Sequence, residues 1–155
     1  MRILRALAAA MATLLSLAAS AAQAQQAAGT VKRVIGSGII VSTAGPRPAQ
    51  VGDSIFPGDR LVTGADSALG ATLADGTLLS VGPLGVLTLQ AFDYESTSRA
   101  GSVVLQAARG AFRMVSGLIA KANPRAIAIH TPTATIGVRG TDVLVDVGED
   151  GQEKP

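Results

Sequence analysis

The sequence predicts an all-β fold in a single domain, and two patterns support this prediction. Apolar and polar residues alternate along Val86 to Phe92 and along Val143 to Val147, which is the period-two pattern of strands with one buried face. Glycines recur every six residues from Gly52 to Gly82, which favours short strands separated by turns. The arrangement expected from this repeat is a compact β-solenoid-like roll of short strands, with an irregular β-sandwich or barrel as the alternative.

The residues available for a core agree with a β fold. The 155-residue chain contains three phenylalanines, one tyrosine and no tryptophan, so its core must consist of Val, Leu, Ile and Ala. Side chains of this size suit thin, closely stacked β layers better than a thick sandwich organised around a buried tryptophan.

Residues 1–24 have the pattern of a cleavable signal peptide. Arg2 and Arg5 precede a long apolar run, and Ala22-Gln23-Ala24 supplies the small-x-small pattern of a signal peptidase site. The apolar run is shorter than the ~20 residues that span a bilayer, which disfavours a membrane anchor. There is no cysteine, hence no lipobox and no disulfide. The mature chain is expected to be soluble in the periplasm or secreted, with no membrane span after cleavage.

The charge balance argues against binding to nucleic acid. Of 13 basic residues, Arg2 and Arg5 lie in the predicted signal, which leaves 11 to match the 11 acidic residues. A nucleic-acid-binding domain needs a basic surplus on one face. The mature domain is neutral, so no nucleic-acid partner is expected.

The first part of the mature chain is expected to contain a leader, a hairpin and a loop. Residues 25–29 form a small polar leader, and a β domain is predicted over residues 30–147. Two β runs, Thr30 to Ile35 and Ile39 to Ser42, flank Gly36-Ser37-Gly38, which predicts a hairpin turn. Thr43 to Pro48 contains one glycine and two prolines and is predicted to be a loop.

The six-residue repeat contains several turn signals. Asp75 and Gly76 lie between two apolar runs and predict a type I′ hairpin. Two earlier Gly-Asp pairs contain Asp53 and Asp59, whose carboxylates suit calcium. Their spacing does not match the alternating ligands of a calcium loop, so turn chemistry is the preferred interpretation. The repeated glycines are Gly52, Gly58, Gly64, Gly70, Gly76 and Gly82.

The polar stretch from Asp93 to Gly101 is the predicted surface loop of the domain, and it contains a single aromatic residue. A recognition surface would first be sought here, although an ordinary solvated hairpin loop is the alternative. Downstream, Val103 to Ala107 and Ala111 to Val115 flank a glycine and predict a second hairpin. The possible recognition residues of the loop are Asp93, Tyr94, Glu95 and Arg99.

The last part of the domain centres on the sequence TPTATIGVRGTDVLVDV, residues 131–147. Ser116 to Arg125 is either a short helix ended by a proline or a connecting loop, and Ala126 to His130 is a predicted strand. Two further β runs then meet at a glycine, and they are expected to form a closing strand pair. The structural motif residues are Pro132, Arg139, Gly140 and Thr141.

This motif has a structural and a functional interpretation. Structurally, Gly140 permits the turn, Thr141 bonds the local backbone, and Arg139 pairs with a carboxylate such as that of Asp142. Functionally, the same turn would be a recognition site with Arg139 at its tip. Residues 148–155 are polar and charged, and this tail is predicted to be disordered.

The residues needed for catalysis are few. His130 is the one histidine, cysteine is absent, and no G-x-S-x-G elbow or phosphate-binding Gly-Lys-Ser/Thr loop occurs. His130, at a strand end before a proline, is interpreted as a partly exposed structural residue. The chain is therefore expected to be a non-enzyme that needs no metal and no cofactor.

Four stretches, in their order and spacing, resemble the FecR family of bacterial periplasmic domains. The stretches are GTVKRVIGSGIIV, VGDSIFPGDRLVTGADSALGATLADGTLLSVGP, GSVVLQAARGAFRMVS and HTPTATIGVRGTDVLV. The resemblance covers about residues 29–147. It implies a periplasmic β domain of the kind found in regulators of iron-uptake sigma factors, which sense an outer-membrane receptor.

The chain departs from those regulators in three respects. It is expected to act without a cytoplasmic sigma-binding domain, an internal transmembrane helix or the additional receptor-engaging domain that follows in the regulators. The function expected is therefore that of a non-catalytic exported module for protein interaction or signalling, with an unknown exported or outer-membrane protein as its partner. The alternative is a cell-wall or glycan-binding domain, or a structural envelope protein.

Overall fold

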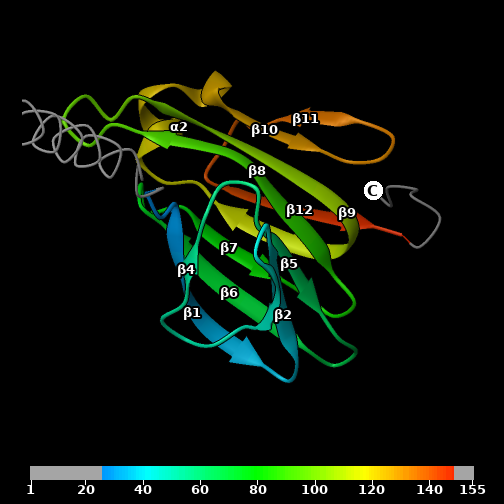
Figure 1. The fold of residues 1–155 in the computed structure, drawn as a ribbon. Coiled ribbons are helices and arrows are strands. Elements are labelled where there is room, and N and C mark those ends of the chain that lie inside the picture. The colour runs from blue at the N-terminus through cyan, green and yellow to red at the C-terminus, as the bar shows by residue number, and fades with distance from the viewer. Residues whose placement is uncertain (1–25, 149–155) are drawn as a thin grey trace, which may run out of the picture.

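The computed structural model describes residues 26–148, and these residues form an almost entirely β fold (Figure 1). The predicted signal peptide and residues 149–155 of the predicted tail lie outside the described residues. The helical elements are α2 (Leu118–Ala122) and a single turn, η2 (Pro124–Ala126). The strands are β1 (Gly29–Ile35), β2 (Gly38–Ser42), β3 (Gly45–Pro48), β4 (Ser54–Ile55), β5 (Arg60–Thr63), β6 (Ala68–Leu73), β7 (Leu78–Val81), β8 (Val86–Tyr94), β9 (Gly101–Val115), β10 (Ile127–His130), β11 (Thr135–Gly137) and β12 (Asp142–Val147).

The strands form one sheet that curls into a half-barrel (Figure 1). Its main path runs β3-β2-β5-β8-β9-β7-β6-β1-β4, and β10, β11 and β12 attach beside it. Neighbouring strands are antiparallel except for β10, which pairs with β9 in parallel. The all-β prediction is confirmed.

The solenoid-like roll is not confirmed. A solenoid stacks successive turns of the chain on one another, whereas the glycine-spaced units here enter antiparallel neighbours such as β6 and β7. The six-residue spacing reflects turns between short strands. Gly52, Gly58 and Gly76 have φ angles of 98°, 95° and 83°, which other residues rarely adopt.

Strand β9 joins the two parts of the sheet. Its first part pairs with β8 and β10, and its last six residues pair with β12. Gly110 has a φ of 79° and lies where β9 passes from one set of partners to the other. The predicted hairpin between Val103 and Val115 is therefore wrong: the glycine bends a continuous strand.

The predicted hairpin between the first two β runs is also wrong. β1 pairs with β4 and β6, whereas β2 pairs with β3 and β5, so the chain passes from one part of the sheet to the other at this corner. Gly36 has a φ of 66°, and the amide of Ser37 donates to Oγ of Ser67 at 3.0 Å. This bond between residues distant in sequence fixes the corner at which the chain passes between the two parts of the sheet.

The segment predicted to be a loop contains strand β3, which pairs with β2 through Ile39↔Pro48 and Val41↔Pro46. β3 ends the path of the sheet. Proline cannot donate to a ladder, so it is tolerated on an edge strand whose second side needs no donor. The two prolines therefore mark an edge of the sheet.

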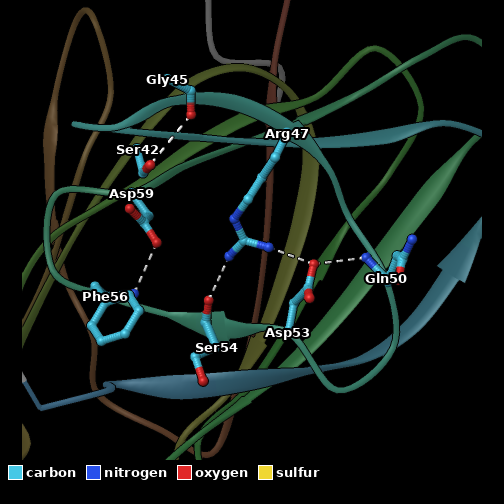
Figure 2. Close-up of polar contacts among 8 residues, drawn as sticks. All are labelled: Ser42, Gly45, Arg47, Gln50, Asp53, Ser54, Phe56 and Asp59. Carbon is cyan, nitrogen blue, oxygen red and sulfur yellow. Dashed lines mark hydrogen bonds and ion pairs between the residues drawn. The ribbon is translucent and has the colours of Figure 1, made fainter.

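An ion pair connects the two ends of the sheet path. Arg47 of β3 donates from one nitrogen to Asp53 at 2.6 Å and from another to the carbonyl of Ser54 in β4 at 2.9 Å (Figure 2). Asp53 also accepts the amide of Gln50, at 3.0 Å. This arginine holds together the ends of the curled sheet that lack backbone pairing to each other.

The two Gly-Asp turns use their carboxylates as expected. Asp53 accepts the amide of Gln50, and Asp59 accepts the amide of Phe56 at 2.9 Å (Figure 2). In each turn the aspartate amide also donates back to the residue three positions earlier. Turn chemistry therefore accounts for both aspartates.

The core is aliphatic, as composition predicts. Buried side chains line the inside of the curled sheet, and Phe112, 3 % exposed, is the one aromatic residue of the described segment in the buried core. The largest fully buried residues are Ile40, Ile55, Leu61, Leu69, Leu87, Leu89, Leu105, Met114, Ile119, Ile127 and Ile129.

Candidate protein-interaction surfaces

The predicted recognition loop is a tight connection between β8 and β9. Strand pairing continues to Tyr94↔Gly101, and the amide of Glu95 donates to the carbonyl of Ala100 at 2.9 Å. Asp93 is exposed within the last part of β8, and Arg99 is exposed with a φ of 59°. The loop therefore projects little beyond its two strands.

The side chains of Tyr94 and Glu95 make contacts within the domain. Tyr94 is half-buried and packs against the core, with its ring centroid 6.5 Å from that of Phe92. The carboxylate of Glu95 accepts the amides of Ser98 and Thr97, at 2.9 and 3.0 Å. These contacts fix the conformation of the loop, and its role in recognition stays a prediction.

The bonds at Glu95 predict an unusual titration. Hydrogen bonds from Ser98 and Thr97 lower the pKa of Glu95 from 4.5 to about 2. Because the folded-state pKa is depressed, the stabilisation is present above pH 4.5 and is lost as pH falls through about 2. Amide chemical shifts of Thr97 and Ser98, followed by NMR from pH 6 to pH 1.5, should move with a midpoint near 2.

The matched variant for this titration is Glu95→Gln, which removes the ionisable group. Its two amide resonances should show no transition over the same pH range. A wild-type midpoint close to 4.5 would contradict the capping geometry.

The Asp75-Gly76 hairpin is confirmed, but its turn is not type I′. That turn needs positive φ at both central residues, and only Gly76 has one, at 83°. The amide of Gly76 donates to the carbonyl of Leu73, and the amide of Leu73 donates to the carbonyl of Thr77. This is the three-residue loop that ends in a glycine bulge, and it turns Asp75 inward.

Asp75 ties that hairpin to α2. It is 1 % exposed and accepts the amide and hydroxyl of Thr77 at 3.0 and 2.8 Å. Its carboxylate and carbonyl also accept the amides of Ile119 and Leu118. The hydroxyl of Thr77 in turn accepts the amide of Gly117 at 3.0 Å. Asp75 therefore has a structural role.

The V-R-G-T turn is anchored by Ser116. The hydroxyl of Ser116 donates to the carbonyl of Gly140 at 2.6 Å, and its amide donates to the carbonyl of Thr141 at 2.8 Å. Gly140 has a φ of 142°. Pro132 lies in the exposed turn between β10 and β11, which is closed by the amide of Thr131 donating to Ala134.

Three details of this stretch differ from expectation. Asp142 pairs with Arg113 of β9, whose Nε donates to the carboxylate at 2.9 Å and lowers the pKa of Asp142. Within residues 26–148 the side chain of Arg139 has no ionic partner, and Thr141 contributes its carbonyl to the turn. The predicted closing strand pair is also wrong, since β11 pairs with β10 and β12 pairs with β9.

Strand β12 presents an open edge. Along one side it pairs with β9, and no strand of the described residues lies along its other side. The amide of Ser116 donates to Thr141, so by alternation the backbone groups of Asp142, Leu144 and Asp146 point to the open side. Leu144 is 74 % exposed.

Leu144 was not among the predicted site residues, although a signal was available. The period-two pattern places it with Asp142 and Asp146 on the solvent face, where a large apolar residue is out of place. Single exposed leucines are common, but the position of this one on an open edge adds significance. Lys121 and Arg125, which line a groove beside the V-R-G-T turn, were also missed, because nothing in the sequence places them near that turn.

Residues 59–154 match the family model described as FecR protein. The chain belongs to the FecR family. FecR membership indicates a signalling or regulatory role. Within the described part of the chain, the helices are too short to cross a membrane.

Comparison with curated proteins finds no match. A solved structure titled "Cell surface anchoring domain" is 29 % identical to this FecR protein over 39 % of this chain and 82 % of that chain, with a TM-score of 0.38. A TM-score at this level does not establish a shared fold. The family match begins within the sheet, after β4, and the earlier strands β1 and β2 pair directly with β6 and β5 inside the matched region.

Proposed function

We propose that this FecR protein is an exported, non-catalytic module that binds another envelope protein by strand addition at the open edge of β12. Family membership supports a signalling role, and the N-terminal pattern supports a periplasmic or secreted location. The observation that carries the binding mode is the open edge itself, with Leu144 74 % exposed at its centre.

Two features of this edge would act on a partner strand: its unpaired backbone groups and its flanking charges. A partner strand would receive backbone hydrogen bonds from alternate residues of β12, and its side chains would cover Leu144. Asp142 and Asp146 flank that leucine, and charges on an edge strand oppose unspecific pairing between sheets. Such an edge favours partners with basic or neutral residues beside the apolar contact. The proposed partner is an exported or outer-membrane protein, and the proposed process is envelope signalling of the iron-uptake type.

The site inventory disfavours glycan binding. Carbohydrate sites stack sugars on exposed aromatic rings, whereas Phe112 is buried, Phe92 and Tyr94 pack against the core, and Phe56 is half-buried. A glycan-binding or structural envelope role therefore has no specific support from the geometry.

Leu144→Pro provides a selective test. Proline removes the amide that points to the open side and the apolar side chain, while the bonds between β12 and β9 use the neighbouring residues. The tagged full chain should be cross-linked mildly in its own cells and its envelope partners identified by quantitative mass spectrometry. Wild type should enrich an envelope protein that Leu144→Pro loses.

The matched control is Val51→Pro, which places a proline at another exposed apolar residue, in the turn closed by Asp53 and Gln50. It should retain the wild-type partner. Far-UV circular dichroism of both variants should match wild type. Equal enrichment by wild type and Leu144→Pro would sink the edge mechanism.

A further inference from the structure

A groove lies between the α2–η2 segment and the V-R-G-T turn. It consists of two adjoining hollows of about 430 and 300 Å³ that share Pro124 and Gly140. This groove is separate from the open edge of β12, on which the proposed function rests. The remaining lining residues are Ser116, Gly117, Ala120, Lys121, Asn123, Arg125, Val138, Arg139 and Thr141.

Three cations gather at this groove without a counter-charge. Lys121, Arg125 and Arg139 are exposed and line it, and no aspartate or glutamate does. Within residues 26–148 none of the three side chains makes an ion pair or hydrogen bond. Their positive charges are therefore available to a ligand.

Two carboxylates on neighbouring elements already accept hydrogen bonds. Asp75 lies beneath Gly117 and is buried, and its oxygens accept bonds from Thr77 and the start of α2. Asp142, which follows the turn, is held by Arg113. The field in the groove is consequently set by the three cations.

The walls of the groove are fixed before any ligand arrives. Ser116 binds the carbonyls of Gly140 and Thr141 and so holds the turn against the end of β9. Val138 is 2 % exposed and forms an apolar base beside Pro124. A site whose shape is set in advance loses less entropy on binding.

From this arrangement we propose that the groove binds an acidic, extended peptide segment of a partner protein. An arginine guanidinium donates two parallel hydrogen bonds to a carboxylate, and the apolar base of the groove suits the side chains between the carboxylates. β11, which leads into the turn, pairs with β10 alone among the described strands, so a peptide backbone has a strand to lie against. A nucleic-acid ligand fits less well, because the 13 basic residues of the sequence are nearly matched by 11 acidic ones.

The test uses the purified chain as exported and a fluorescein-labelled heptapeptide of alternating Glu and Val, with fluorescence anisotropy as the readout. The matched peptide replaces each Glu by Gln. The Glu peptide should bind, and Arg125→Gln combined with Arg139→Gln should weaken it about tenfold or more, since bonds to charged groups are the stronger ones. Arg60→Gln, an exposed arginine elsewhere on the sheet, should bind like wild type.

Several results would overturn the proposal. Equal binding of the Gln peptide would remove the role of charge, and unchanged binding by the double variant would place the peptide elsewhere. Displacement by equimolar inorganic phosphate would assign the groove to small anions. Leu144→Pro should bind the peptide normally, which keeps this test independent of the β12 edge; loss of binding there would place the peptide on that edge instead.

Discussion

Asp75→Ala is expected to lower the free energy of unfolding by about 3 kcal/mol, because it leaves several buried donors without an acceptor. The carboxylate accepts two bonds from Thr77 and one from Ile119, and it is 1 % exposed. Water cannot replace it without opening the junction between the β6–β7 hairpin and α2. Urea denaturation followed by circular dichroism measures the loss.

Asp75→Asn separates shape from charge in the same experiment. The amide fills the same space and keeps one acceptor oxygen, but its NH₂ group meets the donor at Ile119. Its loss should be intermediate, about 1 kcal/mol. An alanine variant that unfolds within 1 kcal/mol of wild type would show that the junction tolerates opening.

Gly110→Ala should cost about 3 kcal/mol and reduce the yield of folded protein, through backbone strain and steric overlap together. Its φ of 79° disfavours any side chain. An added Cβ would also lie 2.7 Å from the Cα of Gly85 and 3.1 Å from the carbonyl of Pro83, both backbone atoms. The crossing of β9 past the β7–β8 connection would have to shift.

Gly76→Ala is the matched control for the bend, since Gly76 has nearly the same φ, 83°, but no atom within 4 Å of an added Cβ. Gly76→Ala should therefore lower the free energy of unfolding by about 1 kcal/mol, from backbone strain alone. Thermal and urea unfolding of the two variants should differ by the cost of the overlap. Equal losses would show that β9 relaxes freely at its bend.

The sequence predicted strand faces well and strand partners poorly, and the reason is physical. Alternation reports which side of a strand is buried, and in β12 it correctly places Val145 and Val147 inside with Asp142 and Asp146 outside. A glycine reports that the backbone bends. A glycine does not indicate which strand the chain pairs with next, so hairpins are predicted at both Gly110 and Gly36. In the structure Gly110 bends a continuous strand, and Gly36 lies where the chain passes from one part of the sheet to the other.

Side-chain partners across the fold were the least predictable feature of the candidate surfaces. Asp142 was expected to pair with Arg139, three residues away, but the strand register brings Arg113 opposite Leu144 and within reach of Asp142. That pairing frees Arg139 for the groove. The acidic turns at Asp53 and Asp59 were predictable, because each carboxylate accepts a backbone amide of its own turn and needs no partner side chain.

The 15-residue strand β9 has a consequence for cooperativity. It pairs with β7, β8, β10 and β12, so its backbone is the common partner of strands from both parts of the sheet. If either part of the sheet detaches, β9 loses hydrogen bonds that hold it in place for the other part. Within residues 26–148, strands of both parts therefore share β9 as a partner, and unfolding is expected to proceed as one all-or-none event.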